Sequence, residues 1–432
     1  MMATDTATWR ITGNEATGVP TLDLLSGQNI VCLAHEPWHG PWKTYQQIMS
    51  LLAKKNRVLY VGPPASLREG VTGLVRRAQR RPLLECVTPT LFVYHEPRLL
   101  GRANNRRPIA RHLNGITARL RLSQARWLAR CCGFAAPILW VFDPMMSRAV
   151  GTFGERLVVY HVLDNYAEFI DPRATALRAA MSKNEGWMLK RADVVVAVSD
   201  SLRQRCLEHN PNSFLVPNGV NTEMFRARAM ARVVPADMRH LARPIIGYVG
   251  AIQPIVDYSL LHRISMERPE WSLVLAGPRD LDGAAQAAFD TLCSRPNVHY
   301  LGCKQVGEVP VYISACDVCL MPYHPRKSTV PDSDSIKLYE YLACGRPVVS
   351  VDVSSAARFS PLVRIARDEE EFVKGVEESL AEGSRFVEAR ELVASEHSWQ
   401  QRVATLSQIL TPLLAPGAST DRSSATSRMA RR

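Results

Sequence analysis

The sequence predicts an α/β fold of two doubly wound, Rossmann-like domains that face each other across a cleft. The chain has 432 residues, more than a single hydrophobic core usually organises, so we expect two domains. Short apolar segments alternate with helical patterns, and after an interruption the alternation starts again. The strands are continuous apolar runs, which is typical of parallel sheets covered by helices on both faces.

The first array opens with a β-α-β unit. Branched and aliphatic residues fill Gln28–Glu36 and Asn56–Pro64, and a helical pattern over Trp42–Lys55 connects them. Five further strands are predicted over Thr90–His95, Pro137–Asp143, Arg156–Asp164, Ala192–Ser199 and Ser213–Val220. We therefore expect an N-terminal extension over residues 1–27 and an acceptor-side domain over residues 28–225.

The second array follows a segment, residues 226–243, that has no periodicity and is interpreted as the linker. Its six strands are predicted over Pro244–Ile252, Trp271–Pro278, Asn297–Cys303, Asp317–Tyr323, Pro347–Asp352 and Leu362–Arg367. The second domain is thus expected over residues 244–397, with a separate C-terminal helix over residues 398–415. Residues 416–432 are Ser, Thr, Ala and Arg with almost no large apolar residue, so they predict a disordered tail.

The composition, 46% hydrophobic and 22% charged, is that of a globular protein. No apolar stretch approaches the roughly 20 residues of a membrane span, and the first residues lack the order of a secretory signal, so we expect a cytoplasmic location. The ten cysteines lie mostly in apolar runs, as reduced core thiols do. Cys316 and Cys319 form a CxxC, but no second pair stands at zinc spacing, so no metal site is expected there.

The net charge of +12 is concentrated in one segment. Between Arg76 and Arg130 there are thirteen arginines and no lysine, against only two glutamates. Such a surface attracts nucleic acid, anionic membrane lipid or phosphorylated substrates. Aromatic residues are sparse in the segment, so nucleic acid is not the expected partner. We expect reversible attachment to an anionic membrane surface, with the helical pattern of residues 113–134 as the contact or, alternatively, as an ordinary surface helix.

The stretch "PDSDSIKLYEYLACGRPVVS", residues 331–350, combines a polar turn, an amphipathic helix and a buried strand. A helix N-terminus exposes N–H groups and a positive dipole end, so the turn at Ser335 with Lys337 beside it is suited to phosphate. Glu340 lies one turn further and could accept hydrogen bonds from ribose hydroxyls. The alternative is a solvated helix with an ordinary cap.

The "DSD" at Asp332–Asp334 also permits a metal interpretation, because two carboxylates two residues apart can hold Mg²⁺. Its position argues against this, since the following helix can neutralise phosphate without a metal. We therefore expect no metal cofactor, with a nucleotide sugar as the co-substrate.

Several segments, in this order, resemble the GT-B glycosyltransferases, in particular family 4 of the nucleotide-sugar-dependent enzymes of bacterial polysaccharide assembly. They are "RADVVVAVSDSL", "VPNGVNTEMF", "IIGYVGAI", "LVLAGP", "YISACDVCLMPY" and "IKLYEYLACGRPVV". The resemblance implies that the C-terminal domain binds the nucleotide diphosphate and that Glu340 binds the ribose. It also implies donor contacts at Gly250, Tyr323, Asp332, Ser335, Ile336 and Lys337.

This chain departs from the family pattern at two places. Asp332 stands where the family has a glutamate, one methylene longer, that contacts the transferred sugar. The basic pair that follows the Gly-rich turn is replaced by Gln253 and Asp257, and Arg326 and Lys327 are candidates to supply that charge.

For catalysis, the resemblance assigns Asp164, which ends an apolar strand at the expected cleft, as the base for the acceptor hydroxyl. The alternative is a strand-end cap for the following turn. His35, Glu36 and Trp38 follow the first strand and are expected on the acceptor side.

The resulting hypothesis is a glycosyltransferase that moves a sugar from a nucleotide-diphosphate donor to a lipid-linked or oligosaccharide acceptor in cell-surface polysaccharide synthesis. The alternatives are a nucleotide-sugar epimerase of the same fold and a non-catalytic binding subunit. A nicotinamide dehydrogenase is disfavoured because no GxGxxG follows a strand.

Overall fold

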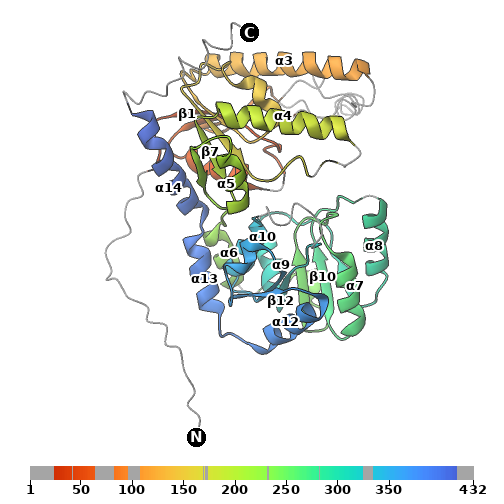
Figure 1. Ribbon diagram of the computed structural model, residues 1–432. Helices are drawn as coiled ribbons and strands as arrows, with labels where there is room; N and C mark the ends of the chain where they lie inside the picture. The colour runs from red at the N-terminus through yellow and green to blue at the C-terminus, as the bar shows by residue number, and fades with distance from the viewer. Residues whose placement is uncertain are drawn as a thin grey trace, which may run out of the picture.

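The computed structural model describes residues 24–40, 42–63, 82–95, 108–168, 170, 174–230, 233–281, 283–324 and 334–415. It contains two α/β domains, each built on a largely parallel sheet flanked by helices (Figure 1). The predictions for residues 1–23 and for the tail at residues 416–432 lie outside the described residues.

The first domain holds an eight-stranded sheet in the order β3-β4-β2-β1-β5-β6-β7-β8. Its strands are β1 (Asn29–Leu33), β2 (Arg57–Val61), β3 (Leu84–Thr88), β4 (Leu91–Tyr94), β5 (Ile138–Val141), β6 (Leu157–Val162), β7 (Val194–Ala197) and β8 (Ser213–Leu215). The seven predicted strands are confirmed. The eighth, β3, pairs antiparallel with β4 at the edge and is largely exposed, so it lacks the apolar run that identified the others.

The second domain holds a six-stranded parallel sheet in the order β11-β10-β9-β12-β13-β14. All six strands agree with the predicted segments. They are β9 (Ile245–Val249), β10 (Ser272–Ala276), β11 (Val298–Tyr300), β12 (Val318–Met321), β13 (Val348–Val351) and β14 (Val363–Ala366).

The helices connect and cover these strands. The α-helices are α1 (Thr44–Leu52), α3 (Pro108–Cys131), α4 (Thr175–Arg191), α5 (Asp200–Leu207), α6 (Thr222–Met230), α7 (Tyr258–Glu267), α8 (Gly283–Cys293), α9 (Val309–Ala315), α10 (Ile336–Ala343), α11 (Ser354–Ala357), α12 (Glu369–Ala381), α13 (Val387–Glu396) and α14 (Trp399–Leu410). The 3₁₀ helices are η2 (Pro144–Ala149), η3 (Ala236–Met238) and η4 (Thr411–Leu414). Among the described residues, no helix is both long and apolar enough to cross a bilayer.

The hydrophobic cores divide the chain differently from the predicted boundaries. Val220 and Phe225 already belong to the core of the second domain, so that core begins before the expected linker. The last helix, α14, returns to the first domain, where Trp399 and Val403 join its core (Figure 1). The expected separate C-terminal helix is therefore a part of the first domain, because its apolar face is buried there.

Asn218 joins the two domains through four hydrogen bonds. Its side-chain oxygen accepts from Thr44 Oγ1 at 2.7 Å, at the start of α1. Its backbone N–H and its Nδ2 donate to the carboxylate and the carbonyl of Asp334, each at 2.6 Å. Arg402 Nε, on α14, donates to its carbonyl at 3.0 Å. One buried residue thus connects α1, α14 and the segment that leads into α10.

We expect Asn218→Ala to lower the free energy of unfolding by about 1 to 3 kcal/mol, because buried partners such as Thr44 lose a hydrogen bond. Guanidinium denaturation measures the change. The control is Asn212→Ala, which removes an exposed amide from the same domain. Equal denaturation midpoints for the two variants would contradict this role.

Candidate active site

The predicted donor residues lie where β9 and β10 end and α10 begins. A Cβ on Gly250 would lie 1.8 Å from Lys337 Cε, and a Cβ on Gly277 would lie 1.9 Å from the Gly250 carbonyl oxygen. Both positions therefore exclude any side chain. Gly250 allows the Lys337 side chain to lie directly over the end of β9, and Gly277 allows the close approach of the Gly250 backbone.

Lys337 is held among aromatic rings. Its Nζ lies 5.6 Å from the ring centroid of Tyr248 and 6.0 Å from that of Tyr323. Burial by itself lowers the pKa of Lys337. The nearby Tyr248 and Tyr323 raise it by more than burial lowers it, so the pKa lies above its ordinary value. The amine is consequently a fixed positive charge at neutral pH, available to an anion.

The N-terminus of α10 lies beside this charge. Ser335 occupies the N-cap position, but its side chain does not cap the helix; its Oγ is hydrogen-bonded to the Tyr323 hydroxyl at 2.9 Å. Ile336 packs against the core of the first domain, which locates this helix end at the domain interface. A helix N-terminus and a fixed cation together form a favourable environment for phosphate.

Glu340 is partly buried one turn further along α10. Burial raises the pKa of its carboxyl to about 7, and the positive charge of Lys337 offsets only part of this effect. Within the described residues, no hydrogen bond to its carboxylate contributes to that pKa. The carboxylate is therefore free to accept hydrogen bonds from ligand hydroxyls, as the sequence predicts for the ribose.

Asp334, the second acid of the DSD sequence, is buried in the domain interface. Besides the Asn218 N–H, the Tyr339 hydroxyl and Arg358 each donate to its Oδ1 at 2.9 Å. Burial raises the pKa of Asp334, and the positive charge of Arg358 and the Asn218 bond lower it. Both carboxylate oxygens are thus engaged within the protein. Its partner in the metal interpretation, Asp332, lies outside the described residues.

The structure explains one of the two residues, Gln253 and Asp257, that stand in place of the expected basic pair. Asp257 is the N-cap of α7, and its carboxylate accepts from the N–H groups of Ser259 at 3.1 Å and Leu260 at 3.0 Å. It therefore has a role in the helix rather than in a site. Arg326 and Lys327, which are candidates to replace the missing charge, lie outside the described residues.

On the opposite side of the interface, polar residues follow three adjacent strands of the first sheet. His35 follows β1, Asp143 follows β5 and Asp164 follows β6. His35 Nδ1 is 3.8 Å from Asp143 Oδ2, and the His35 ring centroid is 5.3 Å from that of Tyr166. The nearby Asp143 carboxylate raises the pKa of His35 above its ordinary value, although burial of the ring opposes this effect. Asp143 and Tyr166 are not among the residues predicted from the sequence, although Asp143, like Asp164, ends a predicted apolar strand.

The other two predicted acceptor-side residues shape the loop after β1. The Glu36 carboxylate pairs with Lys43 Nζ at 2.5 Å, and its carbonyl accepts from the Tyr60 hydroxyl at 2.7 Å. Trp38 is only 6% exposed and packs edge-on against Tyr60, with ring centroids 5.1 Å apart. Trp38 thus anchors the loop, and His35 is the predicted residue that lines the neighbouring cavity.

That cavity, of about 820 Å³, lies in the first domain between α3, η2 and α4 and reaches His35 and Asp143. Its apolar lining residues include Leu122, Met145, Met146, Ile170, Leu177 and Met181. Its basic lining residues are Arg119, Arg121, Arg126 and Arg148. An apolar cavity edged with arginines suits a ligand that has both an apolar part and an anionic part.

Comparison with known proteins identifies the second domain. Residues 243–382 match the family model described as Glycosyl transferases group 1. The chain is 27% identical over 242 residues to TuaH of Bacillus subtilis (strain 168), whose name assigns it provisionally as a glycosyltransferase of teichuronic acid biosynthesis. That match covers 53% of this chain and 57% of the relative, so the chain spans little more than half the relative's length.

Solved structures identify the fold of the whole chain. Sucrose-phosphate synthase from Thermosynechococcus elongatus superposes with a TM-score of 0.67 at 16% identity, covering 89% of this chain and 99% of that one. Anabaena Alr3699/HepE in complex with UDP and glucose gives a TM-score of 0.60 at 13% identity, covering 88% and 99%. The predicted resemblance is confirmed, while the finer assignment to family 4 stays a prediction. The chain has the GT-B fold, and residues 243–382 are similar to the Glycosyl transferases group 1 family.

Proposed function

We propose that the protein is a glycosyltransferase that moves a sugar from a nucleotide-diphosphate donor to a hydroxyl of a lipid-linked glycan in cell-surface, exopolysaccharide-type polysaccharide synthesis. The observation that carries this proposal is the convergence of Gly250, Lys337, the α10 N-terminus and Glu340 at the domain interface. The region of the family match includes this set of residues, and TuaH is named for polysaccharide synthesis.

In this proposal, Lys337 and the turn of Ser335 and Ile336 hold the diphosphate, which is the leaving group. Glu340 accepts hydrogen bonds from the ribose, and Tyr323 lies near the nucleotide. Asp332 is proposed to contact the transferred sugar. The cation and the helix N-terminus supply the positive charge, so no metal is proposed at the diphosphate. HepE structures with UDP-glucose make that compound a suitable probe.

On the acceptor side, Asp164 is the proposed base, and His35 with its partner Asp143 is the alternative. The arginine-edged cavity beside them suits the phosphate and the first apolar units of a lipid-linked acceptor. An epimerase would convert its donor without an acceptor, and a binding subunit would release no nucleotide, so acceptor-dependent release of free UDP distinguishes both from a transferase.

We expect Glu340→Ala to weaken UDP-glucose binding by roughly 10- to 150-fold. Hydrogen bonds to a charged group typically contribute about 1.5 to 3 kcal/mol, and this free energy corresponds to that change in affinity. Because the pKa of Glu340 is about 7, wild-type affinity should fall as the pH drops from 8 to 6, when the carboxylate gains a proton and loses an acceptor. Glu340→Gln should remove this pH dependence. Calorimetry measures both effects.

Glu270→Ala serves as the control, because this exposed acid precedes β10 at the amino end of the sheet, opposite the site. Unchanged affinity in Glu340→Ala at pH 8 would exclude the ribose assignment.

We expect Asp164→Asn to keep its affinity for UDP and to slow acceptor-dependent UDP release by roughly 10² to 10⁴, the usual contribution of a general base. Asp200→Asn, at the exposed start of α5, is the matched control. Normal turnover by a folded Asp164→Asn variant would mean that Asp164 only caps the strand end. If His35→Gln alone slowed acceptor-dependent UDP release by a comparable factor, the His35–Asp143 pair would be the general base instead.

The outer face of α3 supports attachment to a membrane. Ile116, Leu120 and Trp127 are 53%, 51% and 58% exposed, and helical spacing of four and seven residues aligns them on one face. Arg119 and Arg130 are exposed on the same helix. In Figure 1, α3 lies at the end of the first domain away from the second domain. Exposed apolar and basic residues on one helix are typical of helices that lie in the interface of an anionic bilayer.

We expect the protein to sediment with vesicles that contain anionic lipid and to be released by salt, because each basic residue near such a surface contributes about 1 kcal/mol. At 1 M salt, screening shortens to about 3 Å and binding should be lost. Replacing Arg119 and Arg130 by Glu should reduce recovery, whereas the same change at Lys374 and Arg385 of the second domain should not. Equal recovery on neutral and anionic vesicles would refute the attachment.

A further inference from the structure

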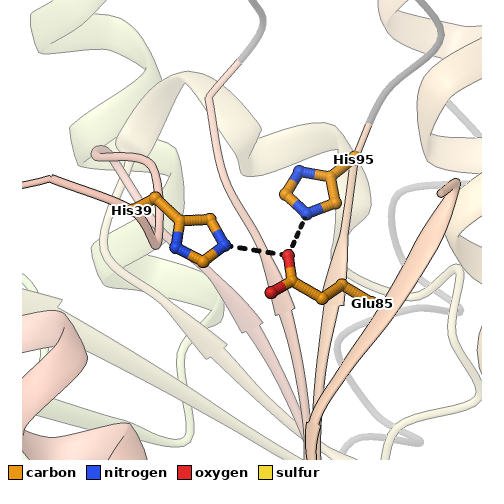
Figure 2. A group of neighbouring side chains, drawn as sticks. All are labelled: His39, Glu85 and His95. Carbon is orange, nitrogen blue, oxygen red and sulfur yellow. Dashed lines mark hydrogen bonds and ion pairs between the residues drawn. The ribbon is translucent and has the colours of Figure 1, made fainter. Parts of the chain in front are cut away.

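Two histidine side chains and one glutamate side chain converge at the β3–β4 edge of the first sheet (Figure 2). His39 Nε2 lies 2.8 Å from Glu85 Oε2, and His95 Nε2 lies 2.6 Å from the same oxygen. All three atoms lie within 4.8 Å of one another. The two imidazole rings are stacked, with centroids 5.9 Å apart and planes inclined by 9°. Both rings therefore direct the same type of nitrogen at one point.

The sheet positions two of these residues. In the antiparallel β3–β4 pair, Glu85 lies opposite Val93, and the His95 N–H donates to the Leu83 carbonyl at 2.9 Å. Since side chains two residues apart share a face, Glu85 and His95 are diagonal neighbours on the same face of the sheet. Their approach is a property of the strand register.

The third residue comes from the loop after β1, which is held from two sides. Gln46 Nε2 donates to the Pro37 carbonyl at 2.9 Å, and the Tyr60 hydroxyl donates to the Glu36 carbonyl. Trp38 is buried against Tyr60. His39 follows directly, so its backbone is anchored while its side chain remains exposed on the surface.

We propose that His39, Glu85 and His95 form a binding site for Zn²⁺. Two imidazole nitrogens and one carboxylate oxygen are a donor set that zinc takes, with water in the fourth position. Zinc bonds of about 2.0 to 2.1 Å require donor atoms roughly 3.3 Å apart, so the donors must separate slightly from their hydrogen-bonded distances. The exposed His39 side chain can make this movement. Among the described residues, the ion pairs of Glu85 are with these two histidines, so no Lys or Arg there competes for the carboxylate.

A metal at this position would join the edge hairpin β3–β4 to the loop that carries Glu36 and Trp38 on the acceptor side. The zinc would stabilise that loop and would contact neither donor nor reacting atoms. This proposal is independent of the proposed function, because the donor residues lie in the other domain.

The test uses untagged full-length protein freed of metal with EDTA and titrated with ZnCl₂ against a chelating dye. We expect one zinc per chain, and no comparable binding of MgCl₂, which prefers oxygen ligands. His39→Gln, Glu85→Gln and His95→Gln should each weaken zinc binding more than about 100-fold, because even outer-shell partners are worth 10- to 100-fold. Circular dichroism verifies folding, and His39→Gln changes only an exposed side chain.

His209→Gln is the matched control, since this exposed histidine follows α5 near the β7–β8 edge, at the opposite end of the sheet. It should keep wild-type zinc affinity. UDP affinity should be equal with and without zinc. A failure of the zinc proposal can therefore be distinguished from a failure of the proposed donor site. Wild-type zinc affinity in His39→Gln or Glu85→Gln, or no binding at micromolar zinc, would overturn the proposal and leave the cluster a hydrogen-bonded triad.

Discussion

The hydrogen bonds between Asn218 and Asp334 are the contact on which the geometry of both halves depends. Asp334 lies just before Ser335, the N-cap of α10, which carries the proposed donor residues, and the Asn218 side chain also binds Thr44 at the first residue of α1. A buried amide or carboxylate that loses its partner costs about 1 to 3 kcal/mol, so these groups strongly favour one arrangement. The donor helix and the acceptor-side helix are therefore positioned by the same few polar atoms.

Within the donor side, sterics and electrostatics depend on each other. A side chain on Gly250 would collide with the Lys337 stem at the end of β9, and a side chain on Gly277 would collide with the Gly250 backbone. The buried lysine in turn requires compensation, which the rings of Tyr248 and Tyr323 provide. The resulting cation beside a helix N-terminus can neutralise a diphosphate, while burial raises the pKa of Glu340 and Lys337 offsets only part of this effect.

The first domain has a different character. Its carboxyl edge carries His35, Asp143 and Asp164, and the adjacent cavity combines methionines and leucines with arginines. Methionine side chains adapt to irregular apolar partners, and a guanidinium group can bind a phosphate through two parallel hydrogen bonds. The exposed apolar face of α3 extends the same combination to the surface. The two domains thus differ in chemistry: the second places a lysine and a glutamate near a helix N-terminus, whereas the first holds a partly apolar cavity edged with arginines.

The sequence by itself determined the parallel sheets and the helix that carries the predicted donor residues. The strands buried on both faces are predominantly apolar runs, and the α10 segment shows its helix start, Lys337 and Glu340 within a few residues. Only the tertiary structure revealed the exposed edge strand β3, the return of α14 to the first domain, the interface role of Asp334 and the cluster at Glu85. The reason is physical: local periodicity reports which face of a segment is buried, whereas these features depend on partners far apart in the chain, such as His39 and Glu85 at a separation of 46 residues. Such polar contacts leave no periodic pattern, and only the register and packing of the folded chain bring them together.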